Sequence, residues 1–100
     1  MKRTDEEKIA LIDAMVKKAK ETSDWGLNEH LWGKEEYDLQ IAAIQKAREQ
    51  FIQYYIKENN RFVWKTVERC FIPTVIENRE EFRRERQNET ENMLAGAEKR

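Results

Sequence analysis

Apolar residues recur every three or four positions in the first twenty residues, which is the spacing of one face of an α-helix. This stripe consists of Ile9, Ile12, Val16 and Ala19. The preceding Thr4-Asp5-Glu6-Glu7 has the sequence of a capping box, in which the Thr side chain binds a backbone amide and the Glu reaches back. The pattern predicts a helix of about 17 residues that ends near Thr22-Ser23.

A short irregular segment follows at residues 23–33, where Gly26 and Gly33 bracket two leucines one helical turn apart. A single turn of helix is compatible with that spacing. Large apolar side chains then recur at spacings of three, four and seven, which predicts one long helix over residues 34–58. The members of this second stripe are Tyr37, Ile41, Ile44, Phe51 and Tyr55. Arg48 falls inside it, so we expect Arg48 at an edge of the core or beside a carboxylate.

Asn59-Asn60 predicts the end of this helix, because Asn tolerates the left-handed conformation that terminates helices. A third helix is expected from about Arg61, with five apolar side chains facing inward. These are Val63, Trp64, Val67, Cys70 and Phe71. Pro73 has no amide proton, so it should kink or restart the helix. Residues 83–92 are polar on all sides, as expected of a projecting charged helix, of one that needs a partner, or of a frayed tail.

Together these elements predict an all-α fold, a three- to four-helix antiparallel bundle with a long central helix and a Pro-kinked, charged C-terminal helix. The 100 residues suffice for one domain, which we expect over residues 1–94 with a disordered tail at 95–100. Charged residues make up 39% of the sequence, yet the net charge is only −1. That balance is typical of a solvated helical surface and not of a disordered chain.

The composition argues against several classes of active site. His30 is the only histidine and Cys70 the only cysteine, which excludes metal sites with two histidines and a disulfide framework. Cys70 lies on an apolar stripe, where a small buried side chain is a simpler interpretation than a nucleophile. The sequence has no glycine-rich phosphate loop. We therefore expect a protein that is not an enzyme and that has no catalytic residue, metal site or cofactor.

One enzymatic alternative stays open, although it is the least favoured. Small all-helical nucleotide pyrophosphohydrolases hold magnesium between carboxylates one turn apart on facing helices. Acidic side chains occur here on two predicted helices, at Glu35, Glu36 and Asp38 and again at Glu77, Glu80 and Glu81. The spacing departs from that arrangement because Gln40 stands four residues after Glu36. Acids at a helix start also stabilise the helix dipole without any metal.

The second alternative is the binding of nucleic acid or of an anionic nucleotide. Four basic residues follow one another at spacings of four, namely Lys57, Arg61, Lys65 and Arg69. Tyr54, Tyr55 and Trp64 lie close to them in the sequence, and cations beside aromatic rings suit phosphates and stacked bases. Against this, the net charge of −1 and the pI near 5.9 differ from those of a typical nucleic-acid-binding domain.

Protein binding is the favoured interpretation. The candidate interface residues are Trp25, Trp32, Phe51, Tyr54, Tyr55, Trp64 and Phe82. These rings exceed what a thin three-helix core is expected to hide, and exposed aromatic patches mark contact sites. For Trp25 and Trp32 a role as a cap on the end of the bundle stays open. Self-association alone would bury such a surface.

The sequence thus predicts a small helical interaction protein that forms a homo-oligomer, binds a protein partner and acts as an accessory or inhibitory factor. Nucleic acid or a nucleotide is the less favoured partner. No apolar run reaches roughly 18 residues, and the N-terminal Met1-Lys2-Arg3-Thr4 leads into acids instead of an apolar stretch. We therefore expect no membrane contact and a cytoplasmic location.

Overall fold

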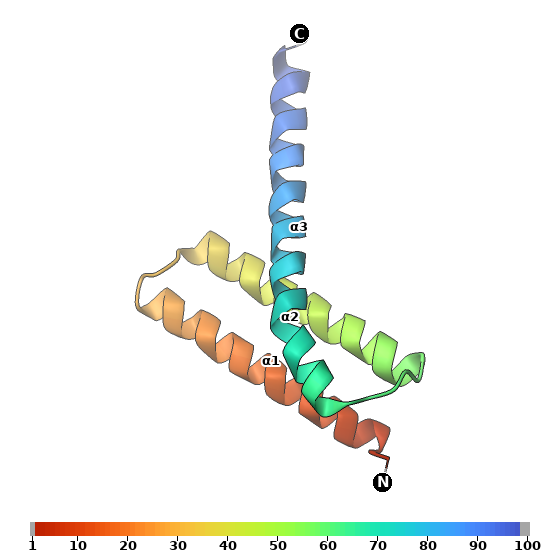
Figure 1. The fold of residues 1–100 in the computed structure, drawn as a ribbon. Coiled ribbons are helices and arrows are strands. Elements are labelled where there is room, and N and C mark those ends of the chain that lie inside the picture. Colours follow the sequence, from red (N-terminus) through yellow and green to blue (C-terminus); the bar gives the residue numbers. More distant parts are fainter. Residues whose placement is uncertain (1, 99–100) are drawn as a thin grey trace.

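The computed structural model describes residues 2–98, and side chains as far as residue 88. Helices α1 (Asp5–Asn28) and α2 (Lys34–Ile52) form an antiparallel hairpin, and α2 continues into a π-helical turn, η1 (Gln53–Lys57). Helix α3 (Trp64–Glu98) crosses this hairpin obliquely and extends well beyond it (Figure 1). α2 packs against both other helices, whereas α1 and α3 contact each other much less. The predicted all-helical class is confirmed, with three α-helices and no strand in the part described.

The predicted Thr4 cap at the start of α1 is confirmed, because the Thr4 hydroxyl oxygen accepts a hydrogen bond from the amide of Glu7 at 3.1 Å. The Glu7 side chain reaches back to the Thr4 hydroxyl, which donates to its Oε1 at 3.3 Å, whereas in a full capping box it would bind the Thr4 amide. The predicted end of the helix near Thr22-Ser23 is wrong, since α1 continues to Asn28. Isolated helices of marginal propensity depend on tertiary packing, and such packing is present over the additional residues.

Two buried contacts stabilise the last turns of α1. The Ser23 hydroxyl donates a hydrogen bond to Oε1 of Gln40 on α2 at 2.8 Å. Trp32, from the connection to α2, covers the buried Gly26 and donates its indole Nε1–H to the carbonyl of Ser23 at 3.1 Å. Ser and Gly are weak helix formers, so it is these contacts with α2 and with the connection that favour the longer helix.

The predicted helix over residues 34–58 corresponds to α2 followed by η1. Its predicted end at Asn59-Asn60 is confirmed. Asn59 has a φ of 56°, and Asn60 donates its side-chain amide to the carbonyl of Tyr54 at 2.8 Å. α3 begins at Trp64, three residues later than expected. The ring of Phe62 packs edge-on against Tyr55 and stacks on Trp64. These two contacts favour the non-helical path of the connection before α3.

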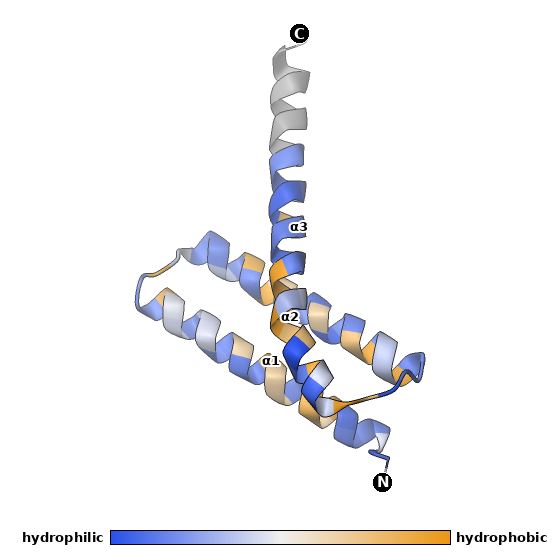
Figure 2. Cartoon of the chain, in the orientation of Figure 1, coloured by the Kyte–Doolittle hydropathy of each residue, from blue (hydrophilic) through white to orange (hydrophobic). Residues whose placement is uncertain are grey.

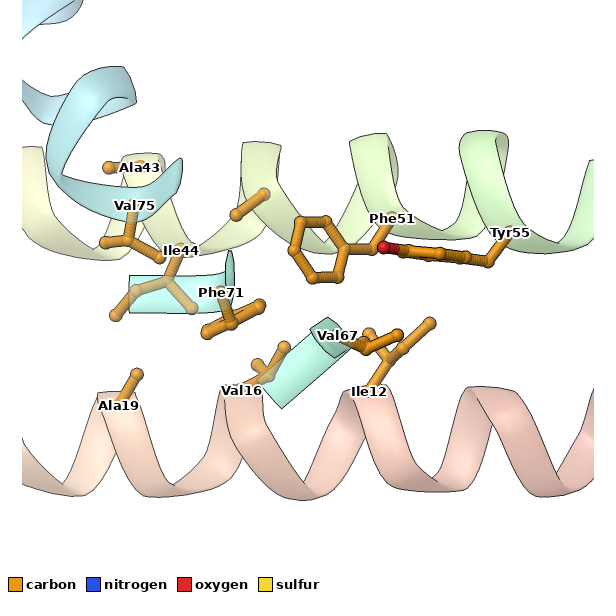
Figure 3. Close-up of a cluster of buried hydrophobic side chains, with 11 residues drawn as sticks. Ile12, Val16, Ala19, Ala43, Ile44, Phe51, Tyr55, Val67, Phe71 and Val75 are labelled. Carbon is orange, nitrogen blue, oxygen red and sulfur yellow. The ribbon is translucent and has the colours of Figure 1, made fainter. Parts of the chain in front are cut away.

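The core lies between the hairpin and the first turns of α3, as Figure 3 shows. Its members are Ile12, Val16 and Ala19 of α1, Ala43, Ile44, Ala47 and Phe51 of α2, Tyr55 of η1, and Val67, Phe71 and Val75 of α3. Two residues expected to face inward do not, because Val63 precedes α3 and Cys70 is exposed. Neighbouring positions on a helix differ by about 100°, so Cys70 points away from the face that Phe71 turns toward the hairpin.

Polar contacts fix how the helices pack. Arg48 lies at the edge of the core and donates its Nε–H to Oδ1 of Asp13 on α1 at 2.6 Å, which confirms the expected carboxylate partner. On the other side of α2, the buried Asn78 of α3 donates its side-chain amide to Oε1 of Gln50 at 2.8 Å. One bond joins α1 to α2 and the other joins α3 to α2, so α2 is the helix against which both others pack.

α3 runs without interruption through Pro73, so the predicted restart of the helix is wrong and the predicted kink stays a prediction. Pro73 and Arg69 are both exposed, so the carbonyl that loses its donor lies on the solvent side, where water satisfies it. The backbone of residues 95–98 is helical, and residues 99–100 of the predicted tail lie outside the described residues. The predicted division into a domain over 1–94 and a tail therefore stays a prediction.

The crossing of α3 gives the chain an extended shape. Its radius of gyration is 17.0 Å, against about 13 Å for a compact domain of this length. Its accessible surface is 7665 Å², roughly 1,600 Å² more than a compact protein of this mass exposes. Hydrophobic residues gather where α3 crosses the hairpin, and the turns that follow are hydrophilic (Figure 2). None of the described helices combines the length and the apolar character needed to cross a membrane.

Candidate interaction surfaces

The seven aromatic residues predicted as interface candidates occupy three environments. Phe51 and Tyr55 belong to the core, where their rings meet edge-on at 5.6 Å, so they present almost no surface to a partner. Three others, Trp32, Trp64 and Phe82, are half-buried. Trp25 and Tyr54 are the two exposed ones, at 57% and 50%. Only the last two groups can contact another molecule without a change in the core.

The two tryptophans near the hairpin turn have different roles. Trp32 covers Gly26 and binds the backbone of α1, as a cap on the end of the hairpin would. Trp25 lies on the outer side of α1 with more than half of its surface in solvent. The capping role that the sequence left open for both therefore fits Trp32, and Trp25 is available for contact.

A groove of about 400 Å³ lies where α3 crosses α1. Its walls include Met15, Lys18 and Thr22 of α1 and Trp64, Phe71 and Ile72 of α3. Ile72 and the exposed Ile76 were not among the predicted site residues, since the direction in which they point depends on where α3 meets the hairpin. Isoleucines one turn apart on a helix were the only sequence signal for this surface.

The two helix faces that line the groove continue beyond it. Lys18, Thr22 and Trp25 share one face of α1, because they are four and three residues apart. Ile76 lies one turn beyond Ile72 on α3. We call five of these side chains the α1–α3 patch. Met15, Trp64 and Ile72 line the groove. The exposed Trp25 and Ile76 extend the faces of α1 and α3 beyond it.

The four cations predicted to bind an anion do not form one stripe. Lys57 lines a hollow of about 810 Å³ beside Tyr54, between η1 and α3. Arg61 lies in the connection before α3, whereas Lys65 and Arg69 share one face of α3. All four are exposed. Residues 58–63 are not helical, so the spacing of four does not place Lys57 and Arg61 on one helix face with Lys65 and Arg69.

Where α3 leaves the hairpin, ion pairs join it to the start of α2. The Glu36 carboxylate lies 2.6 Å from Nη2 of Arg83 and 3.8 Å from Nη1 of Arg79. The hydrogen bond from Arg83 to the Glu36 carboxylate raises the pKa of that guanidinium. Glu80 also pairs with Arg83, at 3.0 Å. Two of the carboxylates considered for magnesium are thus bound to arginines, and in the described part of the chain no three His, Cys, Asp or Glu residues are grouped so that they could hold a metal ion.

The comparisons with known proteins add no relative to this picture. No protein-family model, curated protein or solved structure matches the chain. The function of this chain must therefore be inferred from the chemistry of its surfaces.

Proposed function

We propose that this chain is a helical interaction protein whose copies associate through the α1–α3 patch, and whose oligomer binds a further protein. The observation that carries the proposal is the exposure of Ile72 and Ile76, 51% and 45%, beside an apolar groove. Contiguous apolar surface of this kind marks contact sites, whereas scattered apolar residues need no partner.

Charge favours a second copy as the occupant of the patch. Residues 21–40, which include Trp25, carry six acids and one Lys. Lys65 and Arg69 precede Ile72 on the same face of α3, at spacings of four and three. A twofold axis through the patch would bring the acidic end of one copy to the basic end of the other, because a twofold interface joins each surface to itself in reverse.

The two exposed isoleucines set the expected strength of the association. Burial of a half-exposed isoleucine contributes about 1 kcal/mol. A twofold dimer buries four such side chains, so their loss weakens the dimer by about 4 kcal/mol, roughly a thousandfold in Kd.

The test compares Ile72→Lys/Ile76→Lys with a variant that adds the same charge elsewhere. Gln45→Lys/Asn88→Lys is suitable, since both positions are exposed and neither lines the groove. Size-exclusion chromatography with light scattering at micromolar concentration should give an oligomer for the wild type and the control. The isoleucine variant should elute as a folded 12.1 kDa monomer, with its helical circular dichroism unchanged. An oligomer in the isoleucine variant would refute the proposed interface.

The further protein partner is expected at a different surface. Tyr54 belongs to η1, at the end of the hairpin opposite the α1–α2 turn, whereas Trp25 belongs to the last turns of α1, beside that turn. It is half-exposed and borders the hollow between η1 and α3. Tyrosine is one of the residues that anchor interfaces, so Tyr54 is the candidate contact that self-association would leave free.

A further inference from the structure

A second hollow lies at the end of the hairpin away from the α1–α2 turn. It measures about 990 Å³ and is enclosed by the start of α1 and by the connection between η1 and α3. Four of its lining residues are cations, and we call it the basic hollow after them: Lys2, Arg3, Lys8 and Arg61. Asp5 is the one acid among the described residues that line it. The lining thus carries a net charge of +3 in a chain whose total charge is −1.

Lys8 is the cation least typical of a solvated surface. Its side chain is only 12% exposed, although lysine is rarely buried without a close partner. Its nearest carboxylate is that of Asp5, with the ammonium nitrogen and the oxygen 3.9 Å apart. The ammonium also lies 6.0 Å from the centre of the Phe62 ring. The fold therefore holds this charge in place with little compensation from an anion.

Phe62 brings a second cation to the same place. The guanidinium of Arg3 lies 5.9 Å from the centre of that ring. Both cations are attracted by the negative face of the ring, but they repel each other, and among the described residues Asp5 is the only acid that lines the hollow with them. An anion between them would offset this repulsion.

Arg61 joins this arrangement from the connection between η1 and α3, whose path is constrained just before it. Asn59 has a φ of 56°, and Asn60 is tied to the carbonyl of Tyr54 by its side-chain amide. Arg61 follows directly, and among the described residues neither Arg61 nor Lys2 forms an ion pair with a carboxylate. Two arginines and two lysines thus line one hollow, from segments about fifty residues apart in the chain.

We propose that the basic hollow binds a chain of two or more linked phosphates. Guanidinium groups bind phosphate oxygens through paired hydrogen bonds, and ammonium groups add compact charge. A single carboxylate would leave most of the charge unmatched, whereas successive phosphates supply one or more charges each. Nucleoside triphosphates and nucleic-acid backbones share this chemistry. Of the four cations predicted from the sequence to bind an anion, only Arg61 belongs to this site.

The test is titration calorimetry on the full chain at about 50 mM salt, where exposed charges are weakly screened. The probes are inorganic tripolyphosphate, ATP, a twelve-residue thymidine oligonucleotide and a poly-glutamate peptide of equal charge. Binding of tripolyphosphate and ATP would support a free phosphate chain as the ligand, and binding of the oligonucleotide alone would support a nucleic-acid backbone. In either case the affinity should fall steeply as salt rises. Absence of binding by all phosphate probes, or equally tight binding of poly-glutamate, would overturn the proposal.

Variants locate the binding in the hollow. Lys8→Gln/Arg61→Gln should weaken binding at least tenfold, and Arg61→Gln alone at least threefold. The single variant matters because Lys8 packs against the fold, whereas Arg61 is exposed in a connection. Lys17→Gln/Lys34→Gln removes the same charge at exposed positions outside the hollow and should leave affinity nearly unchanged. An equal loss in this control would show binding by overall charge and overturn the site.

The basic hollow and the α1–α3 patch have no lining residue in common. Phosphate binding is therefore expected in Ile72→Lys/Ile76→Lys as in the wild type. Loss of association and loss of phosphate binding are separate results, so the failure of one proposal leaves the other intact.

Discussion

Gly26 is the position at which a single methyl group should change the end of the hairpin. A Cβ atom there would overlap the six-membered ring of Trp32, which covers this glycine. Because Gly26 is in the middle of a helical turn, the backbone cannot move aside without loss of the last turn of α1. Gly26→Ala should therefore expel the indole and break its hydrogen bond to the carbonyl of Ser23.

The expected cost follows from three terms. Removal of a fully buried Trp costs about 3–5 kcal/mol, so loss of the contacts of the half-buried Trp32 should cost about 2 kcal/mol. The hydrogen bond contributes about 1 kcal/mol. Ala is favoured over Gly in a helix by about 1 kcal/mol, which offsets part of the loss. The free energy of unfolding should fall by about 2 kcal/mol, and Tm by about 10 °C.

Urea and thermal unfolding followed by circular dichroism measure this change. Gly33→Ala is the matched control, because no atom lies within 4 Å of its Cβ position and it should alter stability by less than about 0.5 kcal/mol. In a Trp32→Ala background the sign should reverse, so that Gly26→Ala stabilises the protein through helix propensity. A neutral Gly26→Ala in the wild-type background would refute the packing of Trp32 on α1 and favour a helix that ends near Ser23.

Two further results are expected. Asn78→Ala should lower the free energy of unfolding by about 1–2 kcal/mol, because it removes a buried side chain that donates a hydrogen bond to Gln50. Asn88→Ala, at an exposed position of α3, should have almost no effect, and equal urea midpoints for the two variants would contradict this expectation. Burial raises the pKa of Tyr55 above its ordinary value of 10.0, so the neutral phenol is the form that the fold favours. Its contribution to stability is complete below pH 10 and is lost as the pH rises through the raised pKa. Unfolding midpoints measured between pH 9 and 12 should thus fall less steeply in Tyr55→Phe than in the wild type or in Tyr54→Phe, and identical slopes in all three would exclude the burial of Tyr55.

The parts of the fold that depend on local sequence were predictable. The helix cap at Thr4 and the break at Asn59-Asn60 each involve residues close together in the chain, and both predictions are confirmed. The carboxylate partner of Arg48 was also expected, since a cation inside an apolar stripe needs one. Its identity, Asp13 on another helix, required the structure.

The parts that depend on packing were not predictable. Ser23 and Gly26 have low helix propensity, and only their contacts with Gln40 and Trp32 keep them in α1. The inward face of α3 was assigned too broadly, because Cys70 lies between positions that do face the core. The direction of α3 across the hairpin decides which apolar residues stay exposed, and a periodic pattern carries no information on that direction.

The candidate sites show the same division. The sequence placed Trp25 and Tyr54 among seven interface candidates without separating them from the others. The structure exposes these two and buries Phe51 and Tyr55. Ile72 was missed because an isoleucine in an amphipathic helix normally belongs to the core. The cations of the basic hollow are brought together only by the tertiary structure, since Lys8 lies at the start of α1 and Arg61 lies after η1.

Sedimentation equilibrium of the wild-type chain from about 1 to 100 µM tests most directly whether its exposed apolar surface is a contact between copies. The weight-average mass should exceed 12.1 kDa and approach twice that value as the concentration rises. A mass that stays at 12.1 kDa over the whole range would contradict self-association through the α1–α3 patch.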